Sequence, residues 1–527
     1  MKKQYTILLL CLVGFIFYYG FMHWLGIYPL LDVDETRYVD MAKNMLKNND
    51  YLTLYLNGDY FFEKPPLYFW LECFSFTVLG VINEFSARIP IVLLSLLPAG
   101  FLFFLCKKIK NAKFAIISLV TLFTSLEYMF MTKVAILDSV LTSFVTTSVL
   151  SYFATFFVQE KNKKYFWSLS YVFSALAVLA KGIPGVAIPV IIIAISTAVF
   201  KTYKETLKYS WGILVFLLIT LPWHIIMLKT YPNLFFQEYI YKHHILRFLG
   251  SNVIHRSEPW YFYFITLLWG LFPHIFVLFS KISGIKNIKF DLKDDYSRFL
   301  LLNTIAVLSI LGFFSLSSTK LITYILPIYP FFAVIIGAIW FKYIKNDDKA
   351  VNISMIVLNS IWFVAIILLF FIKFILPQEI YIAFQKIQII TLIIIIPFVI
   401  ASWIFIIKNQ RVKLFFSTAI LMSLLSGFLT PYVYEFNYTF GQNDLMKFAE
   451  IANKNKYTIS TYLTGKKYSL LYYGNQKKIK FYNKNDINWL KKELKKKNNI
   501  IIVRNREIKN LPVKIKIRGF KYSIIER

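Results

Sequence analysis

Ionisable residues gather in a polar stretch between two apolar runs near the start of the chain. Residues 31–66 read LDVDETRYVDMAKNMLKNNDYLTLYLNGDYFFEKPP. Near its start lie Asp34 and Glu35, and near its end lie Glu63 and Lys64, just before two prolines. Carboxylates and cations held together can move protons or stabilise charge that develops during a reaction. The stretch is therefore a candidate active site.

A short amphipathic helix is expected inside this stretch. Its apolar face repeats every three to four residues, as Tyr38, Met41, Ala42, Met45 and Leu46. The opposite face is polar and holds Thr36, Arg37, Asp40, Lys43 and Asn44. Such a helix suits a membrane surface rather than a membrane crossing. Two simpler interpretations remain open: Asp34 as the N-cap of this helix, and Glu63 with Lys64 as an exposed loop pair.

The composition is that of a membrane protein with many spans. Hydrophobic residues make up 57% of the 527 residues and aromatic residues 19%, which excludes an ordinary soluble domain. The run at 66–82 is short and aromatic, and is expected to be re-entrant or interfacial. The three cysteines form no metal or disulfide pattern. We expect about 13 transmembrane helices, near 5–27, 86–106, 113–131, 134–157, 165–180, 182–200, 207–228, 260–280, 299–316, 321–341, 351–375, 386–407 and 413–430.

The distribution of lysine and arginine predicts the orientation. If the N-terminus is inside, every loop expected in the cytoplasm is basic, as the positive-inside rule requires. These loops lie at 107–113, 159–165, 201–208, 281–298, 342–350 and 408–413. The same count places residues 28–85, the loop 229–259 and the C-terminal segment outside. All candidate site residues are then expected on the outer face of the membrane.

A small α/β domain is expected at 431–527. Helical patterns near 443–454 and after Asp486 alternate with strand patterns at 457–463, near 479–483, at IIIVRN and in the final residues. The segment holds 22 Lys and Arg residues against 7 Asp and Glu. We expect this basic surface to meet anionic membrane lipids rather than nucleic acid.

Several motifs, taken in order, resemble one known family. DETRY followed by NG-x-x-(Y/F)-F-EKPP resembles the first outer loop of the bacterial lipid A aminoarabinose transferases, which are related to the protein O-mannosyltransferases. Three further stretches resemble the same family: MTKVAILDSVLT at 131–142, LAKGIPGVAIPV at 179–190 and STKLITYILPIYP at 318–330. The resemblance implies the GT-C fold, an all-α polytopic membrane domain at 1–430 with outer loops 28–85 and 229–259. The α/β domain at 431–527 would then face the periplasm from the bacterial inner membrane.

The chemistry of a lipid-linked sugar selects cations and hydrogen-bond donors. A polyprenyl phosphate gains charge as its bond to the sugar breaks, and a site outside the cytoplasm has no nucleotide to draw on. The candidate groups that would bind this phosphate are Arg37, Tyr38, Lys64, Lys181, Arg247 and Tyr324. The resemblance supports Lys64, Lys181 and Tyr324 among them. It also implies catalytic roles for Asp34, Asp138 and Glu63.

A divalent metal such as zinc is a further expectation from the resemblance. The loop YKHHILRFLGSNVIHR matches a family loop with a metal-binding histidine, which would pair Glu63 with His244. Two ligands are fewer than the three or four that zinc takes. The neighbouring His243 as ligand, and a site without metal, remain open.

The resemblance implies a glycosyltransferase. It would move a sugar, such as 4-amino-4-deoxy-L-arabinose, from undecaprenyl phosphate to a phosphate of lipid A on the outer face of the inner membrane. Transfer to a protein hydroxyl or another envelope glycan is the alternative. A transporter is disfavoured, because the candidate charges lie at the ends of the expected spans rather than inside them.

Overall fold

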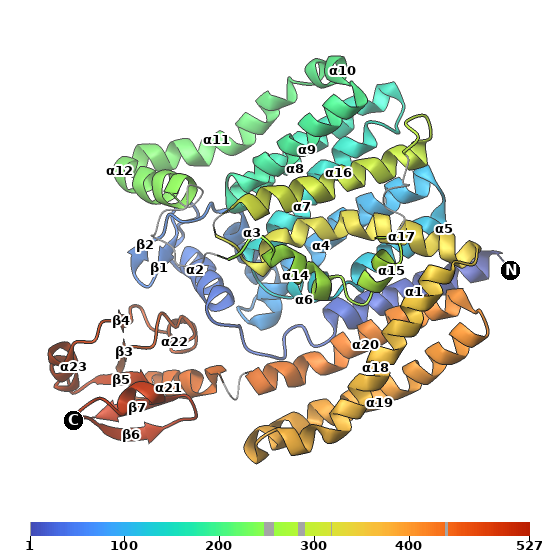
Figure 1. Ribbon diagram of the computed structural model, residues 1–527. Coiled ribbons are helices and arrows are strands. Elements are labelled where there is room, and N and C mark those ends of the chain that lie inside the picture. The colour runs from blue at the N-terminus through green and yellow to red at the C-terminus, as the bar shows by residue number, and fades with distance from the viewer. Residues whose placement is uncertain (1, 247–257, 283–289, 318, 438–440, 527) are drawn as a thin grey trace. The chain divides into compact units, whose positions relative to one another are not determined.

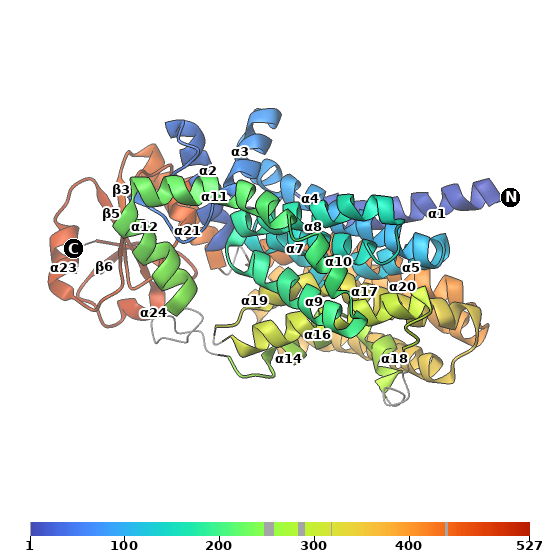
Figure 2. The same cartoon turned by 90° about the horizontal axis from the view of Figure 1, so that it is seen from above.

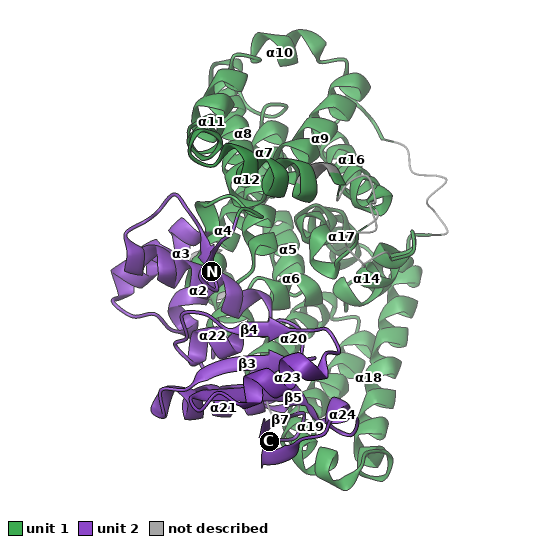
Figure 3. Cartoon of the chain, turned by 90° about the vertical axis from the view of Figure 1, so that its left-hand side faces the viewer, with its two compact units in different colours: residues 1–23, 62–68, 89–429 green, residues 24–61, 69–88, 430–527 purple. Residues whose placement is uncertain are grey.

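The chain divides into two compact units (Figure 3). The structure is a computed structural model that describes residues 2–246, 258–282, 290–317, 319–437 and 441–526. Unit 1 comprises Met1–His23, Phe62–Tyr68 and Ile89–Leu429, and unit 2 comprises Trp24–Phe61, Phe69–Arg88 and Thr430–Arg527. The first outer segment thus groups with the C-terminal segment, whereas the sequence prediction kept them in separate domains.

Unit 1 is built from helices (Figure 1). Backbone N–H and C=O groups in lipid must be paired within the chain, and helices achieve this inside each segment. The helices that lie wholly in this unit are α1 (Lys2–Phe17), η1 (Tyr18–Met22), α5 (Ala112–Phe123), α6 (Leu126–Met131), α7 (Leu137–Ala154), α8 (Glu160–Lys181), α9 (Pro184–Phe200), α10 (Tyr203–Lys208), α11 (Gly212–Thr230), α12 (Pro232–Phe235), η2 (Phe236–Leu246), α14 (Phe262–Gly270), α15 (Ile275–Phe279), α16 (Asp295–Leu316), η4 (Ile322–Ile328), α17 (Tyr329–Lys345), α18 (Lys349–Ile375) and α19 (Gln378–Ile407). Three more helices run along the chain from one unit into the other: α3 (Leu67–Leu79), α4 (Glu84–Ile109) and α20 (Arg411–Asn437).

The polytopic membrane fold is confirmed. Among the described residues, 7 helices are long and apolar enough to cross a membrane: Glu84–Ile109, Gly212–Thr230, Asp295–Leu316, Ile322–Lys345, Lys349–Ile375, Gln378–Ile407 and Arg411–Phe436. Every other predicted span also falls on helix, but 113–131 is divided between α5 and α6, and 260–280 between α14 and α15. The total of about 13 spans stays a prediction. Helix α3 has 13 residues, about 20 Å, too short to cross a bilayer, as expected for 66–82.

Helix α7 is the central element of unit 1 (Figures 1 and 2). It packs against α8, α9 and η4, and nearly all of its side chains are buried. Its many serines and threonines let the neighbouring helices approach closely. Ser148, for example, donates through Oγ to the carbonyl of Ser170 on α8 over 2.7 Å. The start of α7, where Asp138 lies, is therefore held in place by its neighbours.

The C-terminal part of unit 2 is the α/β fold that the pattern predicts. Its five strands form one sheet in the order β4 (Lys480–Tyr482), β3 (Thr458–Tyr462), β5 (Asn499–Arg504), β7 (Tyr522–Glu526), β6 (Lys514–Arg518). Strand β3 is parallel to β4 and β5, and β7 is antiparallel to β5 and β6. A hydrophobic cluster that includes Tyr462, Leu490 and Ile501 forms the core. The elements are α21 (Asn443–Lys454), β3 (Thr458–Tyr462), α22 (Ser469–Tyr473), β4 (Lys480–Tyr482), α23 (Ile487–Leu494), β5 (Asn499–Arg504), α24 (Asn505–Ile508), β6 (Lys514–Arg518) and β7 (Tyr522–Glu526).

The first outer segment contributes α2 (Asp34–Asn48) and a hairpin of β1 (Tyr55–Leu56) and β2 (Asp59–Tyr60). The predicted helix is present, but its apolar face is buried within the protein, apart from the half-buried Leu46, and not left open to a membrane surface. The polar face was predicted wrongly in part, because Thr36 and Asp40 are buried too. The cause is that α2 packs against α22 of the C-terminal segment. Part of the polar side of the helix is therefore covered within unit 2, while Arg37, Lys43 and Asn44 stay partly exposed.

The buried Asp40 predicts a pH dependence. Burial raises the pKa of its carboxyl to about 6, although Asn44 donates to it over 3.1 Å. The folded state thus holds this proton more tightly than the unfolded state, whose carboxyl has a pKa near 3.9. The stabilisation is full below about pH 4 and is lost as the pH rises through about 6.

We expect Asp40→Asn to stabilise unit 2 at about pH 7.5, by up to roughly 3 kcal/mol, and to give little gain at about pH 4.5. Hydrogen exchange of α2 in both proteins at both pH values measures this difference. Asp59→Asn is the control, because the Asp59 side chain is 69% exposed. An equal gain at the two pH values would contradict the assignment.

Candidate functional site

Three predicted site residues meet in unit 1. The ammonium group of Lys181 forms an ion pair with the Asp138 carboxylate. Its Nζ also lies over the ring of Tyr324, 4.4 Å from the ring centroid. The side chains of Lys181 and Asp138 are only 12% and 14% exposed. A cation, a carboxylate and an aromatic face thus form one compact cluster, in which Tyr324 presents its ring to the ammonium group.

The helix ends explain why these residues meet. Asp138 lies in the first turn of α7 and Lys181 in the last turn of α8, where a negative and a positive charge respectively suit the helix dipole. Gly182 follows the last residue of α8 and has a φ of +83°, a backbone conformation that favours glycine. A Cβ on Gly185 would lie 2.4 Å from the backbone of Ala177, so α9 can pack this closely only with glycine there. Backbone conformation at Gly182 and close packing at Gly185 therefore explain the two glycines of the KGIPG segment.

Two buried ionisable residues of unit 1 were not predicted as site residues. Lys133 donates to the Ser426 hydroxyl over 2.6 Å, and its Nζ lies 4.9 Å from the Phe130 ring centroid. The Glu127 carboxyl accepts a hydrogen bond from the Tyr329 hydroxyl. The sequence carried a signal for both, because an ionisable residue in or beside an apolar run marks a paired or functional group.

The EKPP segment also lies in unit 1. Phe62, just before it, packs against Tyr231 and Phe235, with ring centroids 5.1 and 5.8 Å apart. These contacts bring Glu63 to His243, with Oε1 3.8 Å from Nε2. Lys64 is half-buried beside Glu63. The loop histidine that the structure shows beside Glu63 is thus His243.

The predicted metal site on Glu63 and His244 stays a prediction. Among the described residues there is no group of three His, Cys, Asp or Glu side chains that could hold a metal ion. The side chain of His244 and the whole of Arg247 lie outside the described residues. Glu63 and His243 are two of the three or four ligands that zinc takes.

Unit 2 holds a second group of predicted residues. Arg37 Nη2 donates to Asp34 Oδ1 over 2.6 Å and to the Tyr38 hydroxyl over 2.9 Å. The Arg37 guanidinium also lies 4.7 Å from the Tyr38 ring centroid. Asp34 is the first residue of α2, whose N-cap is Val33, so the N-cap interpretation of Asp34 is wrong. Its side chain is 54% exposed, which leaves the carboxylate accessible.

Asp34 and Glu35 are adjacent in the sequence but lie in different surroundings. Glu35 forms a fully buried ion pair with Arg88, whose Nη2 and Nε donate over 2.8 and 2.9 Å. Arg88 also donates to three backbone carbonyls, those of Leu25, Tyr28 and Pro29. Glu35 therefore holds the first outer segment together and does not stand beside Asp34 as a second accessible acid.

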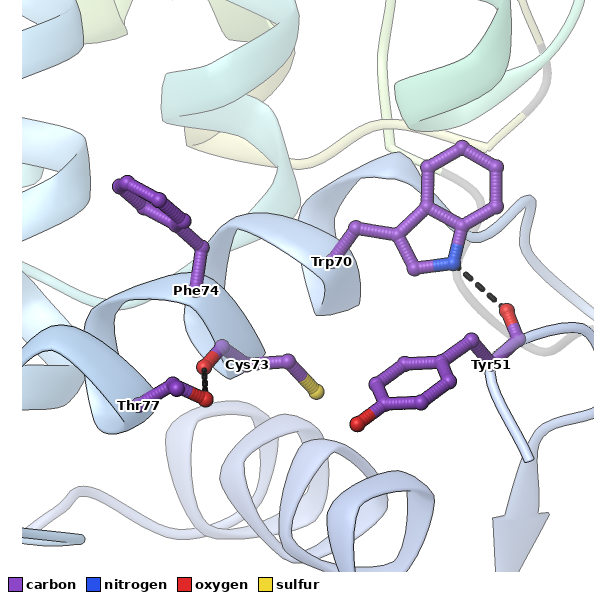
Figure 4. A pocket seen from close by; sticks show the side chains of 5 residues that line it. All are labelled: Tyr51, Trp70, Cys73, Phe74 and Thr77. Carbon is purple, nitrogen blue, oxygen red and sulfur yellow. Dashed lines mark hydrogen bonds between the residues drawn. The ribbon is translucent and has the colours of Figure 1, made fainter. Parts of the chain in front are cut away.

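A pocket of about 380 Å³ lies beside α3 (Figure 4). Its lining residues are Tyr51, Trp70, Cys73, Phe74 and Thr77, and Trp70 Nε1 donates to the Tyr51 carbonyl over 2.6 Å. None of these five lining side chains carries a charge. The pocket therefore lacks the cations that a phosphate requires.

Asp34, Arg37 and Tyr38 lie in unit 2, whereas Glu63, Lys64, Asp138, Lys181 and Tyr324 lie in unit 1. The expectation that all of them converge on one outer face stays a prediction.

The sequence of this chain is similar to those of several known proteins. The model for dolichyl-phosphate-mannose-protein mannosyltransferases matches residues 6–237. An undecaprenyl phosphate-alpha-4-amino-4-deoxy-L-arabinose arabinosyl transferase of Shewanella sediminis is 29% identical over 66% of this chain, and the match spans 63% of that relative's length. An uncharacterised protein of Aquifex aeolicus is 31% identical over 64% of this chain and 73% of its own.

The fold has a close counterpart among solved structures. The crystal structure of ArnT from Cupriavidus metallidurans bound to undecaprenyl phosphate matches with a TM-score of 0.81, at 16% identity, over 100% of this chain and 98% of that one. At this identity the likeness is one of fold. The sequence matches show that the chain belongs to the family of the bacterial aminoarabinose transferases, which are related to the dolichyl-phosphate-mannose-protein mannosyltransferases.

Proposed function

We propose that this protein transfers 4-amino-4-deoxy-L-arabinose from undecaprenyl phosphate to a phosphate group of lipid A. The observation that carries the proposal is the cluster of Asp138, Lys181 and Tyr324 at the meeting point of α7, α8 and η4. The names of the sequence relatives, which are undecaprenyl phosphate-aminoarabinose transferases, support the donor. The motifs of the first outer loop support the lipid acceptor.

The reaction exchanges one phosphate ester of the sugar for another. An oxygen of the acceptor phosphate attacks the anomeric carbon, and the bond from that carbon to the donor phosphate oxygen breaks with its electron pair. Undecaprenyl phosphate leaves with one more negative charge. Because the acceptor phosphate is already ionised near neutral pH, no group has to remove a proton from it.

Lys181 is proposed to stabilise the charge on the departing phosphate. An ammonium group has three N–H donors, of which Asp138 takes one, so the pair can still donate to a phosphate oxygen. The low exposure of the pair strengthens such an interaction, since water screens it less. Lys64 is proposed to bind the same phosphate from the EKPP segment.

The carboxylates are proposed to bind the sugar. The amine of aminoarabinose is a cation near neutral pH, and the accessible carboxylate of Asp34 suits it. Arg37 holds this carboxylate in place from the next turn of α2. The role of a metal on Glu63 and His244 stays a prediction, and metal analysis of the purified protein tests it.

We further propose that the reaction takes place on the periplasmic face of the inner membrane. The basic loops between the spans support this orientation through the positive-inside rule. The excess of lysine and arginine in residues 431–527 supports contact of that segment with anionic lipid headgroups.

Mass spectrometry of lipid A tests the function. In cells that express the protein and make the donor, we expect a lipid A species heavier by one aminoarabinose, and we expect it to be absent when the gene is deleted. Lipid A with identical masses in the two strains would contradict the proposal.

Transfer to a protein hydroxyl is a second candidate, favoured by the match of residues 6–237 to the protein mannosyltransferases. A hydroxyl has to lose its proton, so Asp34 or Asp138 would act as the base. A purified-protein assay that offers intact and dephosphorylated lipid A separates the two candidates. A phosphate acceptor predicts transfer to the intact lipid and none to the dephosphorylated lipid, whereas transfer to a protein hydroxyl predicts that neither lipid is glycosylated.

A further inference from the structure

The first outer segment is bound to the C-terminal segment through Asp32. Its Oδ1 accepts from the backbone N–H of Ser469 over 2.8 Å and from the Thr36 hydroxyl over 2.9 Å. Its Oδ2 accepts from the Ser469 hydroxyl over 2.7 Å. Ser469 is 437 positions away in sequence and begins α22. One carboxylate therefore joins the first turn of α2 to the C-terminal domain.

Two further residues of the C-terminal domain bind the residues just before α2. Gln442 accepts through Oε1 from the Asp32 N–H over 3.1 Å and donates through Nε2 to the Leu30 carbonyl over 2.8 Å. The Tyr473 hydroxyl accepts from the Leu30 N–H and donates to Glu84 Oε1, each over 2.8 Å. Residues 30–32 are thus held by Gln442, just before α21, and by Ser469 and Tyr473, the first and last residues of α22.

Asp32 is half-buried, and several of its partners are buried. Thr36 and Ser469 have no exposed surface, and Gln442 is 7% exposed. Removal of the Asp32 carboxylate would take away the acceptor of the N–H and hydroxyl of the buried Ser469. The link between Lys478 and Asp59, by contrast, is exposed and screened by water. Asp32 is therefore a contact through which the domain can hold the start of α2, since its carboxylate binds both Thr36 and Ser469.

We propose that Asp32 is a positioning residue, through which the C-terminal domain holds Asp34, Arg37 and Tyr38 for sugar transfer. The inference rests on the proposed function. Asp34 follows Asp32 by two residues, and Thr36, which donates to Asp32, stands between Asp34 and Arg37. A shift of about 1 Å in a group that orients substrate can lower a rate about 100-fold.

The test uses the full-length protein in detergent or lipid, with the undecaprenyl-phosphate-linked sugar and lipid A. We expect Asp32→Ala and Ser469→Ala to lower kcat about 10- to 100-fold while the donor KM changes less than about threefold. The double variant should be no worse than Asp32→Ala, because the two residues act through one contact. Asp59→Ala, which removes an exposed acid of the same segment, is the control and should keep the wild-type kcat.

Asp32→Asn separates positioning from charge. An asparagine keeps one carbonyl oxygen for the Ser469 N–H, and its amide can donate to the Ser469 hydroxyl. It should therefore restore most of the activity that Asp32→Ala loses, with an unchanged pH profile. An Asp32→Asn protein as inactive as Asp32→Ala would overturn the positioning role, and so would a wild-type kcat in Asp32→Ala. If Asp32→Ala fails to reach the membrane, Ser469→Ala decides in its place.

Hydrogen exchange of α2 tests the contact without any activity. Exchange in α2 should rise in Asp32→Ala and Ser469→Ala, with no change in α18 and α19 of unit 1. Unchanged exchange in α2 would overturn the inference. A wild-type protein that transfers no sugar would count against the proposed function, and the exchange result would still decide whether Asp32 holds α2.

Discussion

Replacement of Lys181 by methionine is expected to lower the rate of sugar transfer about 100- to 1,000-fold, as for the loss of one preorganised group that stabilises developing charge. Methionine keeps much of the length of the side chain but cannot donate to a phosphate or pair with Asp138. The loss should appear in single-turnover rates with saturating donor, since the charge on the phosphate grows as the bond breaks.

Lys163 provides the matched control for Lys181. It lies on the same helix, α8, and forms ion pairs with Glu160 and Glu205. Lys163→Met should therefore keep the transfer rate within about threefold while it removes a comparable ion pair. If Lys181→Met and Lys163→Met transfer sugar at the same rate, Lys181 only stabilises the fold.

Replacement of Arg88 by methionine is expected to destabilise unit 2 by about 3–5 kcal/mol. The change would leave the Glu35 carboxylate, which is 1% exposed, without its partner in a site that water does not reach. It would also remove the donor from three backbone carbonyls. Hydrogen exchange of α2 and of the five-stranded sheet as a function of urea measures the loss.

Two variants check the cause of this destabilisation. Arg88→Met combined with Glu35→Gln should recover part of the loss, because a buried neutral amide costs less than a buried unpaired charge. Asp34→Asn removes the neighbouring exposed ion pair and should cost less than about 1 kcal/mol. Equal losses for Arg88→Met and Asp34→Asn would contradict the burial argument.

The local patterns of the sequence predicted much of the fold. Apolar runs of sufficient length identified the helices, and short strand patterns identified the five strands β3 to β7 of the C-terminal sheet. The helix at 34–48 followed from its apolar spacing. These features depend on residues close together in the chain, where periodicity is informative.

Contacts between distant segments were the part that the sequence could not predict. The burial of Asp40 depends on α22, which lies more than four hundred residues further along the chain. The pairing of Glu35 with Arg88 and of Asp32 with Ser469 depends on the same packing. The sequence does indicate that Arg88 is paired, because it stands at the start of the apolar run that forms α4.

The candidate site was predictable to the extent that its residues stand at helix ends. Asp138 and Lys181 were selected by motif and by their position between apolar runs, and they meet in the structure. The contact of Glu63 with His243 depends on the packing of Phe62 against Tyr231 and Phe235, for which the sequence has no periodic signal.

Transfer by the purified protein in a lipid bilayer tests the central claim most directly. The assay supplies undecaprenyl-phosphate-linked aminoarabinose and lipid A and follows both the labelled sugar and the released undecaprenyl phosphate. We predict that the wild-type protein forms one molecule of glycosylated lipid A for each undecaprenyl phosphate released. Lys181→Met should both form glycosylated lipid A and release undecaprenyl phosphate far more slowly. Release of undecaprenyl phosphate without glycosylated lipid A, or no release from the wild-type protein, would contradict the account.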